Sequence, residues 1–229
     1  MTVVFVALEV PFFAGNVVKI LDGGWVPLGV ATVLFTVITT WRLGRQRVVT
    51  RLVEAEGSLD DLLAELTSRD VLRVPGTAVF PHASDETVPL ALRANVDRNN
   101  VLHEHVVIIS AGASRLAHVS PEDQLRATAV GPPAAGIVHL DLHYGFFDGP
   151  DIPAALAHAA TSEPALADAD FDNANYFLSR ATLTVGRSRG MAMWRKHLFL
   201  LLAHNAADPG HTFALPSKRT VLMGAEIEI

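Results

Sequence analysis

The chain has 229 residues, a net charge of −6, no cysteine and an apolar fraction of 50%, with a mean hydropathy of +0.31. The lack of cysteine excludes disulfides and thiolate metal sites. The acidic net charge, and the absence of Lys and Arg from residues 127–179, argue against a nucleic-acid-binding protein, which needs a basic surface. The length allows one large domain, or one domain with an appendage.

Two apolar stretches open the chain. Residues 3–21 contain two charged side chains, and residues 25–41 contain none. As helices rising about 1.5 Å per residue, they reach about 25 to 29 Å, close to the bilayer core of about 30 Å. Trp25 and Trp41 bracket the second stretch, as interfacial aromatic residues do. We therefore predict two transmembrane helices, in preference to a buried hairpin of a soluble protein or a cleaved signal peptide, which would begin with basic residues.

Four arginines follow the second stretch directly: Arg42, Arg45, Arg47 and Arg51. Because short loops rich in Lys and Arg stay in the cytoplasm, these arginines mark the cytoplasmic end of the second helix. The N-terminus is then also cytoplasmic, and the tight connection at residues 22–24 faces outside. Residues 1–42 are thus predicted to form the membrane part of the chain.

Residues 43–70 are predicted to form an amphipathic connecting helix, because leucines recur there at helical spacing. Gly57-Ser58 interrupts the pattern, and Ser58 is a candidate N-cap for the second part. Residues 71–229 are predicted to form a cytoplasmic α/β domain. Its elements alternate between strands and helices, which is typical of a mixed-sheet α/β sandwich.

The elements expected in this domain follow from β-branched runs, helical periodicity and capping residues. Strands are expected at residues 72–80, 104–112, 124–130, 136–147, 175–185 and 219–229, and helices at 88–99, 151–161 and 191–206. The strands at 124–130 and 136–147 are expected to pair antiparallel. The last helix is expected to have an apolar face made of Met191, Trp194, Leu198, Leu201 and Leu202.

One candidate metal site lies in the strand at 136–147. His139, Asp141 and His143 alternate with apolar residues, so all three point to one face of that strand. Imidazole and carboxylate ligands there would suit zinc or another divalent cation. The simpler interpretation is that Val138, Leu140 and Leu142 fill the core and the three polar residues face water, and we prefer it.

Glu9 is the candidate functional residue of the membrane part. An ionisable side chain inside a membrane span costs several kcal/mol unless it is paired or hydrated, so a functional role is the default hypothesis. Asn16 follows on the same helix, and we assign both residues to a candidate ion pathway. The alternative is that Glu9 lies near the cytoplasmic end of its span and reaches the lipid headgroups.

Several motifs together resemble the Kup/HAK/KT family of potassium uptake permeases. EVPFFAGNVVKILDGGWVPLGVATVLFTVITTWRLGR, at residues 9–45, is similar to the last two transmembrane helices of that family. RVPGTAVF, LRANVDRNNVLHEHVVI, YFLSR, WRKHLFLLLAHNA and FALPSKRTVLMGAEIEI follow in the family's order. The resemblance covers essentially the whole chain and identifies it as the C-terminal part of such a permease.

The resemblance implies proton-coupled potassium uptake across the bacterial inner membrane, by about twelve helices followed by a cytoplasmic domain. The potassium-coordinating residues are then expected in earlier helices, outside this chain. Glu9 falls where the family tends to have an acid. His204-Asn205 stands where the family usually has Arg-Asn. The positive charge that the family's arginine carries at this position is therefore weakened.

We therefore expect the C-terminal portion of a potassium:proton symporter, with partners that include potassium, protons and membrane lipid. The cytoplasmic domain is expected to be regulatory or to form a homodimer, with no catalytic activity, cofactor or nucleic-acid partner. One alternative is a stand-alone membrane-anchored regulatory or interaction protein without transport activity. Another is a membrane-anchored metal-dependent enzyme that uses His139, Asp141 and His143.

Overall fold

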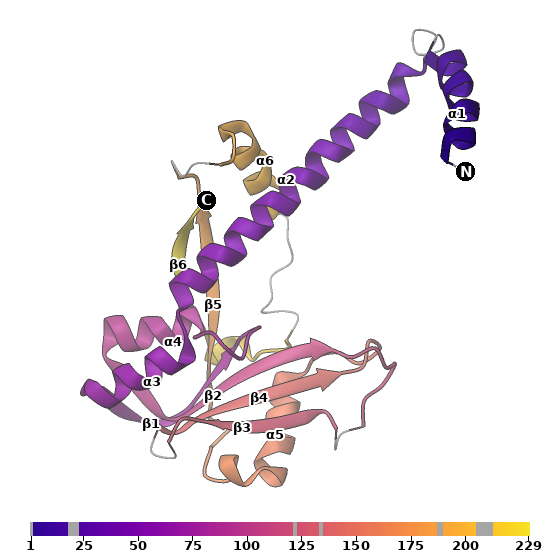
Figure 1. The fold of residues 1–229 in the computed structure, drawn as a ribbon. Coiled ribbons are helices and arrows are strands. Elements are labelled where there is room, and N and C mark those ends of the chain that lie inside the picture. The colour runs from indigo at the N-terminus through magenta and orange to yellow at the C-terminus, as the bar shows by residue number, and fades with distance from the viewer. Residues whose placement is uncertain (1, 18–22, 121–122, 133–134, 187–189, 205–212) are drawn as a thin grey trace. The chain divides into compact units, whose positions relative to one another are not determined.

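The computed structural model describes residues 2–17, 23–120, 123–132, 135–186, 190–204 and 213–229 (Figure 1). The chain divides into two compact units. The first contains residues 1–47 and 189–204, and the second contains residues 48–188 and 205–229. The first unit is helical, and the second holds a sheet with helices on both faces.

The first unit contains α1 (Thr2–Val17), most of α2 (Trp25–Glu56) and α6 (Met193–His204). Within the described residues, α2 is the one helix long and apolar enough to cross a membrane, and α1 contains a shorter apolar segment. The 32 residues of α2 span about 48 Å, so a core of about 30 Å takes up roughly its first twenty residues. The predicted second membrane helix and the first half of the connecting helix are therefore one uninterrupted helix.

The second unit is built on a six-stranded sheet with the order β3-β4-β2-β1-β5-β6. The strands are β1 (Leu72–Pro81), β2 (Val101–Ala113), β3 (Leu125–Val130), β4 (Ile137–Tyr144), β5 (Asn175–Thr184) and β6 (Thr220–Glu228). Only β3 runs antiparallel to its neighbour, β4. Both the mixed sheet and the antiparallel pair are as predicted.

Helices cover both faces of this sheet (Figure 1). They are α3 (Leu59–Ser68), α4 (Leu90–Ala94), continued by a π-helical turn at Asn95–Asn99, and α5 (Ile152–Ser162); two short 3₁₀ turns lie at Pro164–Leu166 and Ser217–Arg219. Ile152 and Leu156 of α5 pack on one face with Leu140. Leu62 of α3 and Leu92 of α4 pack on the other. The unit therefore has three layers with two apolar cores.

The predicted cap at Ser58 is confirmed, and together with a cap at Asp151 it explains where α3 and α5 begin. The Ser58 hydroxyl accepts a hydrogen bond from the Asp61 N–H at 3.1 Å, and the Asp151 carboxylate accepts one from the Ala154 N–H at 3.0 Å. Each cap satisfies a backbone N–H that has no partner within its helix.

The predicted apolar face of α6 is wrong in part. Lys196 and Phe199 are its buried residues, whereas Trp194 is 57% exposed and Leu201 is 65% exposed. Helical spacing alone ranks residues by hydrophobicity, and it cannot show which side chains of a helix the rest of the chain covers. This inversion of polarity is unusual for a helix of a soluble domain.

Candidate functional site

The membrane part places Glu9 and Asn16 on one helix. Both lie in α1, seven residues or about two turns apart. Glu9 is exposed in this chain, and among the described residues it forms no ion pair. Pro11 lies inside the helix between them and removes one backbone hydrogen bond there.

The end of α2 is anchored in the second unit through its backbone. Gly57 ends the helix with a positive φ of 69°, a conformation that glycine adopts without steric cost. The Leu59 N–H then donates to the Glu86 carbonyl at 3.1 Å, and the Val88 N–H donates to the Gly57 carbonyl at 3.2 Å. An isolated antiparallel bridge joins Ser58 to Thr87. The segment that leaves α2 is therefore fixed to the loop before α4.

A buried polar cluster lies at this anchor. Glu56, the last residue of α2, is 3% exposed, and its Oε2 lies 3.7 Å from Nε2 of His82. That nitrogen also lies 2.8 Å from the Thr87 hydroxyl. We call Glu56, His82 and Thr87 the junction cluster. It links the last turn of α2 to the residue that follows β1.

The electrostatics of the junction cluster keep His82 neutral at pH 7. The pKa of His82 is lowered to about 4, mainly by burial and also by the charge of His139, while a hydrogen bond to the Thr87 backbone acts in the opposite direction. Burial also raises the pKa of Glu56, which lies fifteen residues beyond Trp41, outside the membrane-spanning segment. The contact between Glu56 and His82 is therefore a polar contact rather than an ion pair at neutral pH, because the imidazole carries no charge.

The three predicted metal ligands share one face of β4 but differ in burial. His139 is 4% exposed, Asp141 is half-buried and His143 is exposed. The preferred interpretation, a wholly water-facing row, is wrong for His139, because α3 and α4 cover that face of the sheet. Nδ1 of His139 lies 3.6 Å from Oδ2 of Asp141, and the Ser110 hydroxyl donates to Oδ1 of Asp141 at 2.5 Å.

This arrangement does not form a metal centre in the part of the chain that the structure describes. No three His, Asp or Glu side chains converge there closely enough to hold an ion. One buried atom, Nε2 of His139, makes no hydrogen bond within the described residues.

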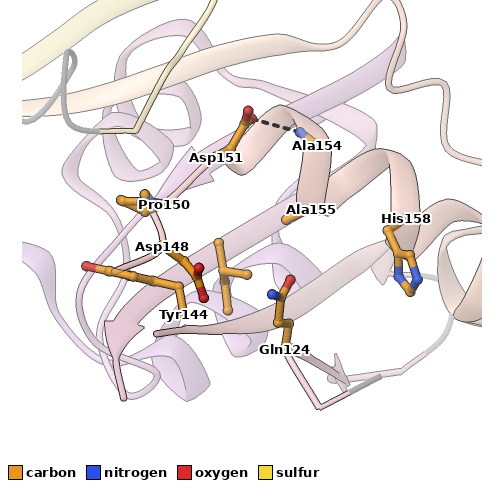
Figure 2. Close-up of a pocket in the computed structure, with 10 residues that line it drawn as sticks. Gln124, Tyr144, Asp148, Pro150, Asp151, Ala154, Ala155 and His158 are labelled. Carbon is orange, nitrogen blue, oxygen red and sulfur yellow. Dashed lines mark hydrogen bonds between the residues drawn. The ribbon is translucent and has the colours of Figure 1, made fainter. Parts of the chain in front are cut away.

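A cavity of about 250 Å³ lies at the end of β4 and the start of α5 (Figure 2). Gln124, Tyr144, Asp148, Asp151 and His158 contribute its polar groups. Its two carboxylates already have partners in the chain, since Asp148 lies 2.6 Å from Nδ1 of His118 and Asp151 caps α5. Both carboxylates of the cavity therefore already make contacts within the described residues.

Sequence reasoning missed the junction cluster. The break at Gly57-Ser58 indicates where α2 ends, but nothing local marks His82 or Thr87 as its partners. They are 26 and 31 residues away from Glu56 in the chain, and only the position of β1 beside the loop brings them together.

Replacing His82 by asparagine should remove an acid-dependent loss of stability. The unfolded chain binds a proton at His82 near pH 6.5, but the folded chain binds it only near pH 4. The stability due to neutral His82 is thus fully present above pH 6.5 and is lost as the pH falls to about 4, by at most about 3 kcal/mol. Hydrogen exchange of the β1 amides at pH 7 and at pH 4 would measure the difference between wild type and H82N.

Glu56 acts in the opposite direction, because its raised pKa makes protonation favour the folded state. The comparison between wild type and H82N at each pH isolates the His82 contribution. H143N, at an exposed position, is the matched control and should leave the pH dependence unchanged. A pH dependence that is the same in H82N and wild type would contradict the burial of a neutral His82.

Comparisons with known proteins identify the family. A family described as the K+ potassium transporter C-terminal domain matches residues 75–229. The K+ potassium transporter integral membrane domain matches residues 1–46. This chain belongs to the K+ potassium transporter family. It is a membrane protein family, and the stand-alone regulatory alternative is not favoured.

The chain is similar to several proteins named "Probable potassium transport system protein Kup". It is 40% identical to the one from Rhodococcus jostii over 97% of this chain, and 42% identical to the one from Thiobacillus denitrificans over 98%. A third, from Cutibacterium acnes, is 38% identical over 97%. The chain spans about a third of the length of these relatives, 34%, 35% and 34% respectively. No solved structure matches it.

Proposed function

We propose that this chain supplies the last two membrane helices and the cytoplasmic domain of a potassium:proton symporter that mediates potassium uptake. The symporter is a multi-pass protein of the bacterial inner membrane. One observation carries the proposal: α2 runs unbroken from a charge-free apolar segment, through four arginines, to the buried junction cluster. The relatives named as potassium transport proteins support the transported ion.

The membrane helices of this chain complete an ion pathway that other helices must also line. Two helices enclose no channel, so Glu9 and Asn16 act together with preceding membrane segments. A carboxylate in that position can bind and release protons. The free-energy cost of placing its charge inside the membrane is offset by pairing or hydration. Potassium and protons are therefore partners of the assembled transporter.

The cytoplasmic domain regulates or dimerises the transporter and carries no catalytic activity. β6 is an edge strand of the sheet, with Val221 and Leu222 exposed, and an unpaired edge of this kind can pair with a second copy. Basic residues lie at its start and acidic residues at its end, so a two-fold antiparallel pair would oppose unlike charges. A chain that sediments in detergent as a single copy would contradict this homodimer.

The proposed topology is testable because the chain has no natural cysteine. Gly24→Cys lies in the connection between α1 and α2, and Asp60→Cys lies on the exposed side of α3. A membrane-impermeant maleimide should label G24C in intact cells and label D60C only after permeabilisation. Labelling of D60C in intact cells would place the α/β domain outside the cell and contradict the proposal.

A further inference from the structure

α6 packs against α2 as part of the first unit. The Arg195 guanidinium donates from Nη2 to the Thr39 hydroxyl at 2.8 Å and from Nε to the Thr40 hydroxyl at 3.2 Å. The Phe199 ring lies 5.6 Å from the Trp41 ring, centroid to centroid. Thr40 is fully buried in this contact. A segment from the C-terminal part of the sequence is thus attached to the last membrane helix by polar and aromatic contacts.

These contacts fix the depth of α6 relative to the membrane. They fall at residues 39–41 of α2, which are the final residues of the charge-free stretch. A bilayer core of about 30 Å that begins at Trp25 ends near Gly44, about twenty residues later. α6 therefore lies at the cytoplasmic surface of the bilayer, beside the residues where α2 leaves it.

The outward face of α6 is apolar. Met193 is 54% exposed, Trp194 is 57% exposed and Leu201 is 65% exposed. His197, exposed as well, lies between them at helical spacing. The cationic residues Arg195 and Lys196 are directed inward, since Arg195 binds the two threonines and Lys196 is 1% exposed. A helix that buries its charges and exposes its apolar residues suits a lipid surface better than water.

We propose that α6 is an interfacial membrane helix whose Met193, Trp194 and Leu201 insert into the inner leaflet. The proposal rests on the proposed membrane span of α2. Lipid is the occupant that these residues favour, because tryptophan concentrates at the headgroup level. Arg42 and Arg45 of α2 add attraction to anionic headgroups at the same depth. Residues 190–204 are then attached both to the bilayer and to α2 through α6.

The chain has three tryptophans, Trp25, Trp41 and Trp194, which permits a test with single reporters. The variant W25F/W41F retains only Trp194, and W41F/W194F retains only Trp25. Each full chain is reconstituted into vesicles of phosphatidylcholine and phosphatidylglycerol, with or without bromine on the upper acyl carbons. Bromine quenches tryptophan on contact, so Trp194 fluorescence should fall at least twofold in the brominated vesicles. Iodide in the aqueous phase should have little effect on it.

The two reporters separate the outcomes. Quenching of Trp25 without quenching of Trp194 would overturn the interfacial helix and leave the membrane span intact. Quenching of neither would overturn the membrane span itself. In the Trp194 reporter, the further change M193E/L201E should abolish quenching, because it places two charges on the inserting face. Quenching that persists in that variant would show that a different face meets the lipid and would overturn the proposal.

Discussion

Replacing Glu9 by glutamine is expected to reduce potassium uptake at least tenfold in a transporter that contains this chain. The carboxylate is the single acidic group of α1. A carboxylate inside a membrane span costs a few kcal/mol of free energy, so such residues mark sites that bind an ion or a proton. Glutamine has nearly the same shape as glutamate, but it carries no charge and cannot bind or release a proton. Rubidium tracer influx into uptake-deficient cells would measure the change.

The measurement uses this chain joined to the part of the Rhodococcus jostii relative that it does not match, since the chain spans 34% of that relative. E9D is the matched variant, since it retains a titratable group, and it should keep more activity than E9Q. Wild-type influx in E9Q would show that Glu9 only reaches the lipid headgroups. That result would remove Glu9 from the ion pathway and leave the family assignment unaffected.

Replacing Gly44 by leucine is expected to detach α6 from α2. A Cβ atom at Gly44 would lie 2.2 Å from the Phe199 ring, and Phe199 is almost completely buried. The ring must leave its place, and losing the burial of a phenylalanine costs about 3 kcal/mol or more. Hydrogen exchange of the α6 amides in detergent should accelerate at least tenfold, which corresponds to about 1.4 kcal/mol.

Gly29 provides the matched control, because no atom lies within 4 Å of a Cβ added there. G29L should leave exchange in α6 at the wild-type rate. The double variant G44L/F199A should exchange more slowly than G44L, since the leucine can occupy the space that the ring vacates. Equal exchange in G44L and wild type would contradict the packing of α6 on α2.

Much of the fold could be predicted because its signals are local. The charge-free stretch before Arg42 indicates a membrane helix. The Ser58 and Asp151 caps can each be recognised from a segment of four residues. The short connection at residues 131–136 indicates the antiparallel pair of β3 and β4. Each of these features depends on the periodicity or capping of a single segment or of neighbouring segments.

The features that could not be predicted depend on contacts between distant segments. His139 looked water-facing because β4 alternates, but α3 and α4 cover the face of the sheet that His139 shares with Ile137. The burial of Lys196 and the exposure of Trp194 do not follow from the spacing within α6, and the neighbouring Arg195 binds Thr39, more than 150 residues earlier. The junction cluster likewise joins residues from three segments. Glu9 and Asn16 were chosen from their chemistry, and Glu9 also from the family resemblance, and their role stays a prediction.

Potassium uptake by the assembled transporter tests the proposed function most directly. Cells that lack their own uptake systems would express this chain alone, the Rhodococcus membrane segments alone, or the two joined in one polypeptide. We predict rubidium influx and growth at low potassium only for the joined polypeptide, because two membrane helices enclose no pathway. Influx through this chain alone, or no influx through a joined polypeptide that reaches the membrane, would contradict the assignment of this chain to a potassium transporter.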